Sequence, residues 1–178
     1  SKVDWVNTSF AVKAQSEALP LRKTVPILIE GTEEQMVLYL HKAKPLGFYT
    51  YVPRDMVARS DAKTFTVHSR FSGKVNHNVK IQLIKMNHSS VGQAAEELKR
   101  KLKADGFSLS TPPNRRFGFA KQEYWIGKSG LVGRAAVFEY NDQPYAIYYH
   151  YPPEYADGFE PRLEIILDEL VWYESQYK

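Results

Sequence analysis

Two neighbouring segments, residues 131–140 and 143–151, constrain the fold most, because both carry apolar side chains at nearly every position. An Asn-Asp dipeptide separates them and predicts a two-residue hairpin turn. That turn pairs Phe138 with Tyr145, so apolar residues lie opposite each other across the hairpin. A strand that is apolar on both faces is usually covered on both faces. The sequence therefore predicts that helices pack against this hairpin from two sides.

Two further stretches have the apolar spacing of a helix. The first follows the capping pattern Ser90-x-x-Gln93 and stops before Gly106, which predicts a helix over 90–105. The second follows a proline-rich turn and predicts a helix over 159–171, laid back on the sheet. Its apolar residues recur at helical spacing: Phe159, Leu163, Ile166 and Leu170.

The remaining apolar segments alternate as strands and are joined by short turns. Together with the helices they predict an α+β domain, an α/β/α sandwich. Its central, mainly antiparallel sheet has about six or seven strands and carries helices on both faces. We assign residues 25–178 to this single domain. Residues 1–24 show no sustained period, and we expect an N-terminal leader or tether that is partly flexible.

A second hairpin, at residues 64–86, carries two of the five histidines. Pairing Phe71 with Val75 across a three-residue turn brings apolar residues opposite each other. This register places His68 and His77 on opposite faces of the sheet, where they cannot share a ligand. Helical histidine pairs at metal-binding spacing are absent from the sequence, and we predict no metal site.

Composition limits the class of protein only weakly. The chain has 178 residues and no cysteine, which fits one domain without disulfides or thiolate metal ligands. No apolar run approaches the length of a membrane span. The formal net charge of +4 is compatible with an anionic membrane surface or with nucleic acid, and it is specific to neither.

Two stretches resemble a known fold family: "LGFYTYVPRDM" at 46–56 and "YYHYPPEYADGFEPRLEIILDELVW" at 148–172. They are similar to the early strand and turn, and to the last strand, proline turn and closing helix, of the PsbP/Mog1-like family. Within that family the chain is most similar to bacterial lipoproteins of the same plan. The resemblance implies a non-enzymatic binding or accessory domain. Because a lipid-bearing cysteine precedes the domain in those lipoproteins, it also implies an extracytoplasmic, membrane-tethered protein, with a cytoplasmic location as the alternative.

Three patterns bear on catalysis. The segment GKSG at 127–130 contains part of a phosphate-binding loop, but the first glycine of the full pattern is missing and a strand turn explains it better. Asp157 and Glu160 could act as paired carboxylates, yet their place at a helix start favours stabilisation of the helix dipole. No serine lies in a nucleophile-elbow motif. We therefore predict no catalytic residue and no cofactor. The alternative is a small hydrolase-type enzyme with a cleft beside the C-terminal helix.

Basic residues gather at the end of the first helix and in the loop that follows it. They are Lys99, Arg100, Lys101, Lys103, Arg115 and Arg116. One hypothesis is that they form a surface patch that rests on anionic lipid headgroups. The alternative, which we favour, is that the helix-end cations only complement the dipole.

Basic and aromatic residues also interleave at 114–125, as in proteins that bind single-stranded nucleic acid. Alternation in a half-buried strand produces the same pattern, so we do not expect nucleic-acid binding. The expected function is a non-catalytic binding or accessory module. Its expected partner is an unidentified protein or an anionic membrane surface.

Overall fold

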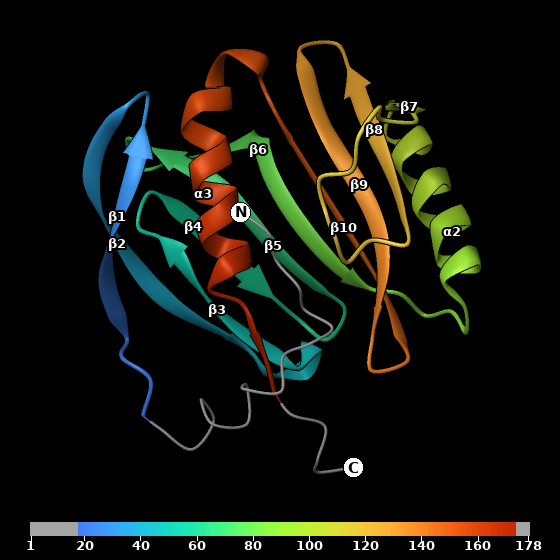
Figure 1. The fold of residues 1–178 in the computed structure, drawn as a ribbon, viewed down its shortest axis with the longest axis horizontal. Helices are drawn as coiled ribbons and strands as arrows, with labels where there is room; N and C mark the ends of the chain where they lie inside the picture. The colour runs from blue at the N-terminus through green and yellow to red at the C-terminus, as the bar shows by residue number, and fades with distance from the viewer. Residues whose placement is uncertain (1–17, 174–178) are drawn as a thin grey trace.

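The computed structural model describes residues 18–173, which form two antiparallel β-sheets and two α-helices (Figure 1). The small sheet has the strand order β1-β2-β3-β11 and consists of β1 (Arg22–Ile29), β2 (Thr32–Ala43), β3 (Phe48–Pro53) and β11 (Val171–Trp172). The large sheet has the order β4-β5-β6-β10-β9-β8-β7 and consists of β4 (Met56–Ser60), β5 (Thr64–Phe71), β6 (Lys74–Lys85), β7 (Ser108–Ser110), β8 (Gln122–Lys128), β9 (Leu131–Tyr140) and β10 (Gln143–Tyr151). Of the predicted leader, residues 1–17 lie outside the described residues, and β1 begins within the remainder.

The first helix, α2 (Val91–Ala104), covers one face of the large sheet. Ser90 caps it as expected, because its hydroxyl oxygen accepts a hydrogen bond of 3.1 Å from the backbone N–H of Gln93. The predicted helix over 90–105 is therefore confirmed to within one residue at each end.

In the part of the chain that the structure describes, no helix has both the length and the apolar character that a membrane crossing requires.

The second helix, α3 (Ala156–Asp168), starts and ends three residues earlier than the predicted span 159–171. It ends early because the chain beyond it pairs with β3 as β11, which satisfies backbone groups in a ladder. Thr50 of β3 donates its hydroxyl to the carbonyl of Ile166 at 2.7 Å. This buried bond holds α3 against the small sheet, on which it lies in Figure 1.

The predicted α/β/α sandwich, with one central sheet and helices on both faces, is wrong. Of the described residues, 53% lie in strands and 21% in helices, and the strands form separate sheets of four and seven strands. The turn at Arg54 and Asp55 carries the chain from β3 in the small sheet to β4 in the large sheet. The small sheet and α3 together cover the face of the large sheet opposite α2. A strand that is apolar on both faces needs two covers, and a second sheet supplies one of them here.

The register of the β9–β10 hairpin is confirmed. Phe138 pairs with Tyr145, and both residues of the Asn-Asp turn have positive φ angles, of 57° and 64°. Adjacent tyrosines of β10 face different cores: Tyr149 packs with the small sheet and α3, whereas Tyr148 packs with α2. We call these two sides of the large sheet the Tyr149 face and the Tyr148 face.

The predicted register of the β5–β6 hairpin is wrong. Phe71 pairs with Lys74 across a two-residue turn, and not with Val75 across a three-residue turn. Continued past Ser69 and Asn76, the register of this turn places His68 opposite His77, and an irregularity between His68 and Ser69 then shifts the ladder. His68 and His77, which we expected on opposite faces, therefore lie in contact with their ring centres 4.7 Å apart.

The close approach of β9 and β10 gives a test of the fold. A Cβ atom added to Gly133 would lie 1.8 Å from the backbone oxygen of Tyr149, an atom that cannot rotate away. We predict that Gly133→Ala lowers the free energy of unfolding by about 3 kcal/mol, as severe overpacking does, measured by urea denaturation. Gly118→Ala is the matched control, because no atom lies within 4 Å of the added Cβ there. Equal losses in the two variants would contradict the packing that we describe.

Candidate ligand-binding site

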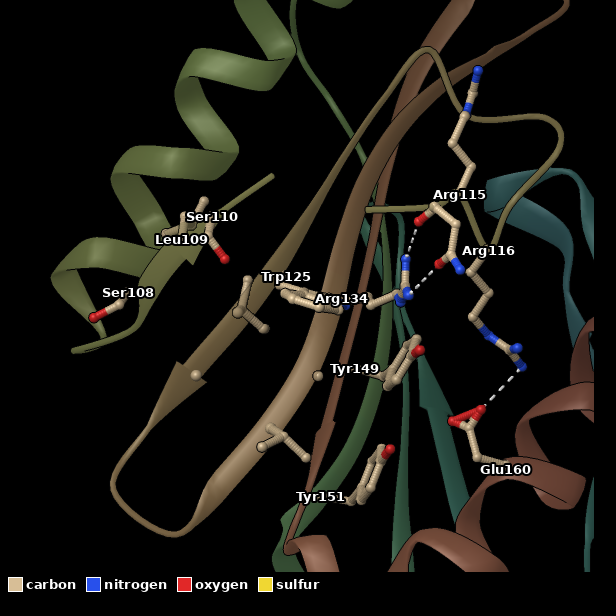
Figure 2. Close-up of a pocket in the computed structure, with 15 residues that line it drawn as sticks. Ser108, Leu109, Ser110, Arg115, Arg116, Trp125, Arg134, Tyr149, Tyr151 and Glu160 are labelled. Atoms are coloured by element: carbon tan, nitrogen blue, oxygen red, sulfur yellow. Dashed lines mark hydrogen bonds and ion pairs between the residues drawn. The ribbon is translucent and has the colours of Figure 1, made fainter. Parts of the chain in front are cut away.

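An open cavity of about 1070 Å³ lies on the Tyr149 face of the large sheet. Strands β8, β9 and β10 form its floor, the loop after β7 forms one wall, and the start of α3 contributes Glu160. Figure 2 shows Arg134 and Tyr149 on the floor, with Arg116 reaching in from the loop toward Glu160. The cavity therefore gathers side chains from segments that are far apart in the sequence.

The loop wall is held in place by a buried carboxylate. The side chain of Glu123 is only 2% exposed, and it accepts backbone hydrogen bonds from Arg116 at 2.8 Å and from Phe117 at 3.1 Å. Arg134 on the neighbouring strand donates to the same carboxylate at 2.5 Å. Burying a charge is costly unless it is paired and hydrogen-bonded, and these three contacts meet that requirement. The carboxylate thereby fixes the loop against β8 and β9.

Arg134 also reaches the loop directly. Its guanidinium donates to the backbone oxygen of Asn114 at 3.1 Å and lies 5.8 Å from the ring centre of Trp125. These contacts occupy the guanidinium on several sides, and Figure 2 shows it spanning the floor toward the loop. Arg134 therefore acts chiefly as a positioning residue for the cavity wall.

Arg116 is paired much more loosely than Arg134. Its guanidinium lies 3.3 Å from a carboxylate oxygen of Glu160 and 3.7 Å from one of Glu164. Charge-assisted hydrogen bonds of this kind are normally about 2.7–2.9 Å long. Within residues 18–173, Nε of Arg116 is buried and lacks a hydrogen-bond partner. Of Arg116 and Arg134, Arg116 is therefore the one that an incoming anion can engage more easily.

Glu160 is the carboxylate that lines the cavity, and its environment disfavours its charge. Burial raises the pKa of Glu160, nearby Arg116 lowers it and Glu164 raises it, with a net shift upward from the ordinary value. A proton on Glu160 removes its attraction for Arg116. Protonation of Glu160 therefore leaves Arg116 paired only with the more distant Glu164 and more available to another anion.

An aromatic surface faces these charges. Trp125 is 43% exposed, and the rings of Tyr149 and Tyr151 lie nearly parallel with centres 6.1 Å apart. Burial raises the pKa of both tyrosines above the ordinary value, so their hydroxyls stay protonated and can donate hydrogen bonds. Cavities with apolar ring surface and a few placed polar groups are typical of small-molecule sites.

The structure divides the predicted basic residues between two places. Lys99, Arg100, Lys101 and Lys103 belong to α2, which covers the Tyr148 face, whereas Arg115 and Arg116 line the cavity on the Tyr149 face. Lys99 and Arg100 already pair with glutamates of their own helix. Figure 2 shows the side chain of Arg115 directed away from Tyr149. Contact of either group with an anionic membrane stays a prediction.

The two catalytic patterns also have definite places. The GKSG segment at 127–130 spans the end of β8 and the turn into β9, which confirms the interpretation as a strand turn. Of the two carboxylates that we considered as a pair, Glu160 lines the cavity, whereas Asp157 is outside its lining. Both lie in the first turns of α3.

Sequence reasoning missed Glu123 and Arg134. Trp125 pairs with Arg134 in the β8–β9 ladder, and Glu123 lies two residues before Trp125 on the same strand face. A carboxylate and an arginine at neighbouring inward-facing positions of two adjacent strands are a signal for a buried ion pair. The strand register was needed to see that signal.

No protein-family model and no curated protein sequence matches the chain. The resemblance to the PsbP/Mog1-like family therefore stays a prediction.

Removing the buried charge of Glu123 should destabilise the loop that forms the cavity wall. Glu123→Gln keeps the shape of the side chain but leaves Arg134 without its anion, and breaking a buried pair typically costs about 3–5 kcal/mol. We expect a decrease in the free energy of unfolding of this size by chemical denaturation. Glu154→Gln, at an exposed position, should have almost no effect. A change below about 1 kcal/mol, the range of surface pairs, in Glu123→Gln would show that the pair is not structural.

The raised pKa of Glu160 predicts a specific dependence of stability on pH. Across the range from the ordinary value of 4.5 up to the raised value, the folded chain binds more protons at Glu160 than the unfolded chain does. Stability therefore falls as pH rises through this range. We predict that the melting temperature of the wild type, relative to that of Glu160→Gln, decreases as pH is raised from 4.5 to 7. A difference that is constant or increases with pH would contradict this assignment.

Proposed function

We propose that this chain is a non-catalytic binding module whose cavity takes a small ligand with an anionic group beside an aromatic ring. One observation carries the proposal: Arg116 is loosely paired and faces an aromatic surface across a cavity whose wall is already fixed. A pre-formed site of this kind spares a ligand the cost of ordering the protein on binding.

The balance of charge around the cavity supports an anionic ligand. Three arginines, at positions 115, 116 and 134, line it together with one carboxylate, Glu160. A cleft lined mainly by one sign of charge focuses the electrostatic potential and attracts the opposite charge. A ligand carboxylate, sulfonate or phosphate would replace Glu160 at the guanidinium of Arg116 and bring that group closer to ideal pairing distance.

The ring surfaces support an aromatic or flat apolar part of the ligand. Trp125 keeps almost half of its surface exposed and Tyr151 is half-buried, whereas Tyr149 is buried beneath the floor with its ring nearly parallel to that of Tyr151. Stacking on such rings contributes binding energy without requiring a particular hydrogen-bond pattern. Together with Arg116, they select a ligand by the combination of charge and ring.

The biological setting that we propose is that of an accessory module outside the cytoplasm, tethered to a membrane. The support comes from the resemblance to bacterial lipoproteins and from a cysteine-free composition. The ligand-binding cavity then serves as the module's recognition site, and its protein partner is unidentified.

One observation favours a hydrolase-type enzyme as the second candidate. The cavity lies beside α3, where the alternative hypothesis places a catalytic cleft, and burial raises the pKa of Glu160, as a general acid requires. Binding is the better-supported function because Glu123, the other carboxylate close to the loop, is fully occupied by hydrogen bonds. An enzyme that uses Glu160 would lose turnover in Glu160→Gln, whereas a binding module would bind anions more tightly in that variant.

A matched pair of fluorescent probes tests the proposal. 8-Anilino-1-naphthalenesulfonate carries rings and an anionic group, and N-phenyl-1-naphthylamine carries the same rings without the charge. We predict that Arg116→Gln weakens the sulfonate about tenfold, the loss expected for one charge-assisted contact. The affinity for the neutral probe should be unchanged. Glu160→Gln should strengthen binding of the sulfonate.

Arg70→Gln is the matched control, because this exposed arginine lies on β5, outside the cavity lining and away from β8 and β9 in the sheet. Its affinity for both probes should equal that of the wild type. Equal loss of sulfonate binding in the Arg70 and Arg116 variants would show general surface attraction and contradict a site at the cavity.

A further inference from the structure

A second feature of the molecule lies outside the cavity, on the β5–β6 ladder. His68 and His77 are in edge-to-face contact, with ring centres 4.7 Å apart and an angle of 67° between the rings. The two-residue turn between Phe71 and Lys74 accounts for this contact, because its register, continued past Ser69 and Asn76, places His68 opposite His77. His77 is exposed and His68 is half-buried, so solvent reaches the pair.

These two imidazoles differ from those of His41 and His150, whose ring nitrogens are already hydrogen-bonded. His41 makes a hydrogen bond of 2.7 Å with Ser60, and His150 makes one of 2.9 Å with the backbone oxygen of Asn78. Neither His68 nor His77 makes a hydrogen bond within residues 18–173. Two imidazoles that contact each other and have no other polar partner retain free lone pairs for a ligand.

We propose that His68 and His77 form a binding site for a late first-row divalent cation, with Zn²⁺ as the representative ion. The distance between the rings fits this role. With Zn–N bonds of roughly 2.0–2.1 Å, two imidazoles on one tetrahedral ion have their ring centres roughly 5 Å apart. Small rotations of two partly exposed side chains are therefore enough to direct both nitrogens at one ion.

The electrostatic surroundings explain which ions the site accepts. The side chains of Lys80 and Arg59 carry positive charge near His68 and repel metal ions in general. The site therefore favours ions that bind imidazole strongly over Mg²⁺ and Ca²⁺, which require oxygen ligands.

The coordination sphere that the chain supplies is incomplete. Among the described residues, no group of three histidine, cysteine, aspartate or glutamate side chains is placed to hold a metal ion. Water or a small anion completes the sphere, which is the arrangement of an open site. Because the pair lies on β5 and β6 and the cavity lies over β8–β10, this inference is independent of the proposed function.

A zinc titration of the chain without a purification tag tests the inference. In a non-chelating buffer at pH 7, the histidine ring signals of the wild type should shift on addition of Zn²⁺ and saturate at one ion per chain. His68→Gln and His77→Gln should each weaken zinc binding by about tenfold or more, since each removes one of two ligands. Excess Mg²⁺ should not compete.

His88→Gln is the matched control, because this histidine is outside the pair, and it should bind zinc like the wild type. If a variant fails to fold, the ring signals of the wild type still decide, because only those of His68 and His77 should move at low zinc. Absence of saturable binding, or zinc shifts confined to other histidines, would overturn the proposal.

Discussion

The buried carboxylate of Glu123 is the interaction on which the candidate site depends. A charge with 2% of its side chain exposed is tolerated only when donors surround it, and the donors here are Arg134 and two backbone N–H groups of a loop. The loop has no regular secondary structure of its own at these residues. Its path is therefore set by what the carboxylate requires. An apolar replacement could match the stability of such a pair, but it would not specify where the loop N–H groups lie.

Two arginines of the same cavity have different functions because of their distances to carboxylates. Arg134 lies 2.5 Å from Glu123 and is committed to the wall, whereas Arg116 lies 3.3 Å from Glu160 and 3.7 Å from Glu164. The backbone of Arg116 is held by Glu123 while its guanidinium stays loosely paired. This residue therefore combines a fixed position with an available charge. That combination is what a site for an anionic ligand needs.

Local signals in the sequence predicted the local structure well. The Ser90 cap placed α2, and the Asn-Asp turn gave the register of β9–β10. Signals that depend on distant partners were missed. The pattern of β1–β3 does not show that the turn at Arg54 starts a second sheet, so the sandwich prediction failed. One local signal was also misread: the turn between β5 and β6 has two residues and not three, and the predicted register separated two histidines that are in contact. For the site, Arg115 and Arg116 were singled out as basic residues, but the cavity depends on a buried pair between β8 and β9.

Amide hydrogen exchange at Arg116 and Phe117, followed by NMR, tests most directly whether the carboxylate of Glu123 fixes the cavity wall. Both amides lie in a loop, yet both donate to a buried acceptor. We predict that these two amides exchange as slowly as amides in the interior of β8, because they become exposed only when this part of the sheet opens. Exchange of both amides at the rate of an unprotected loop would contradict it, and the cavity would then lack a fixed wall.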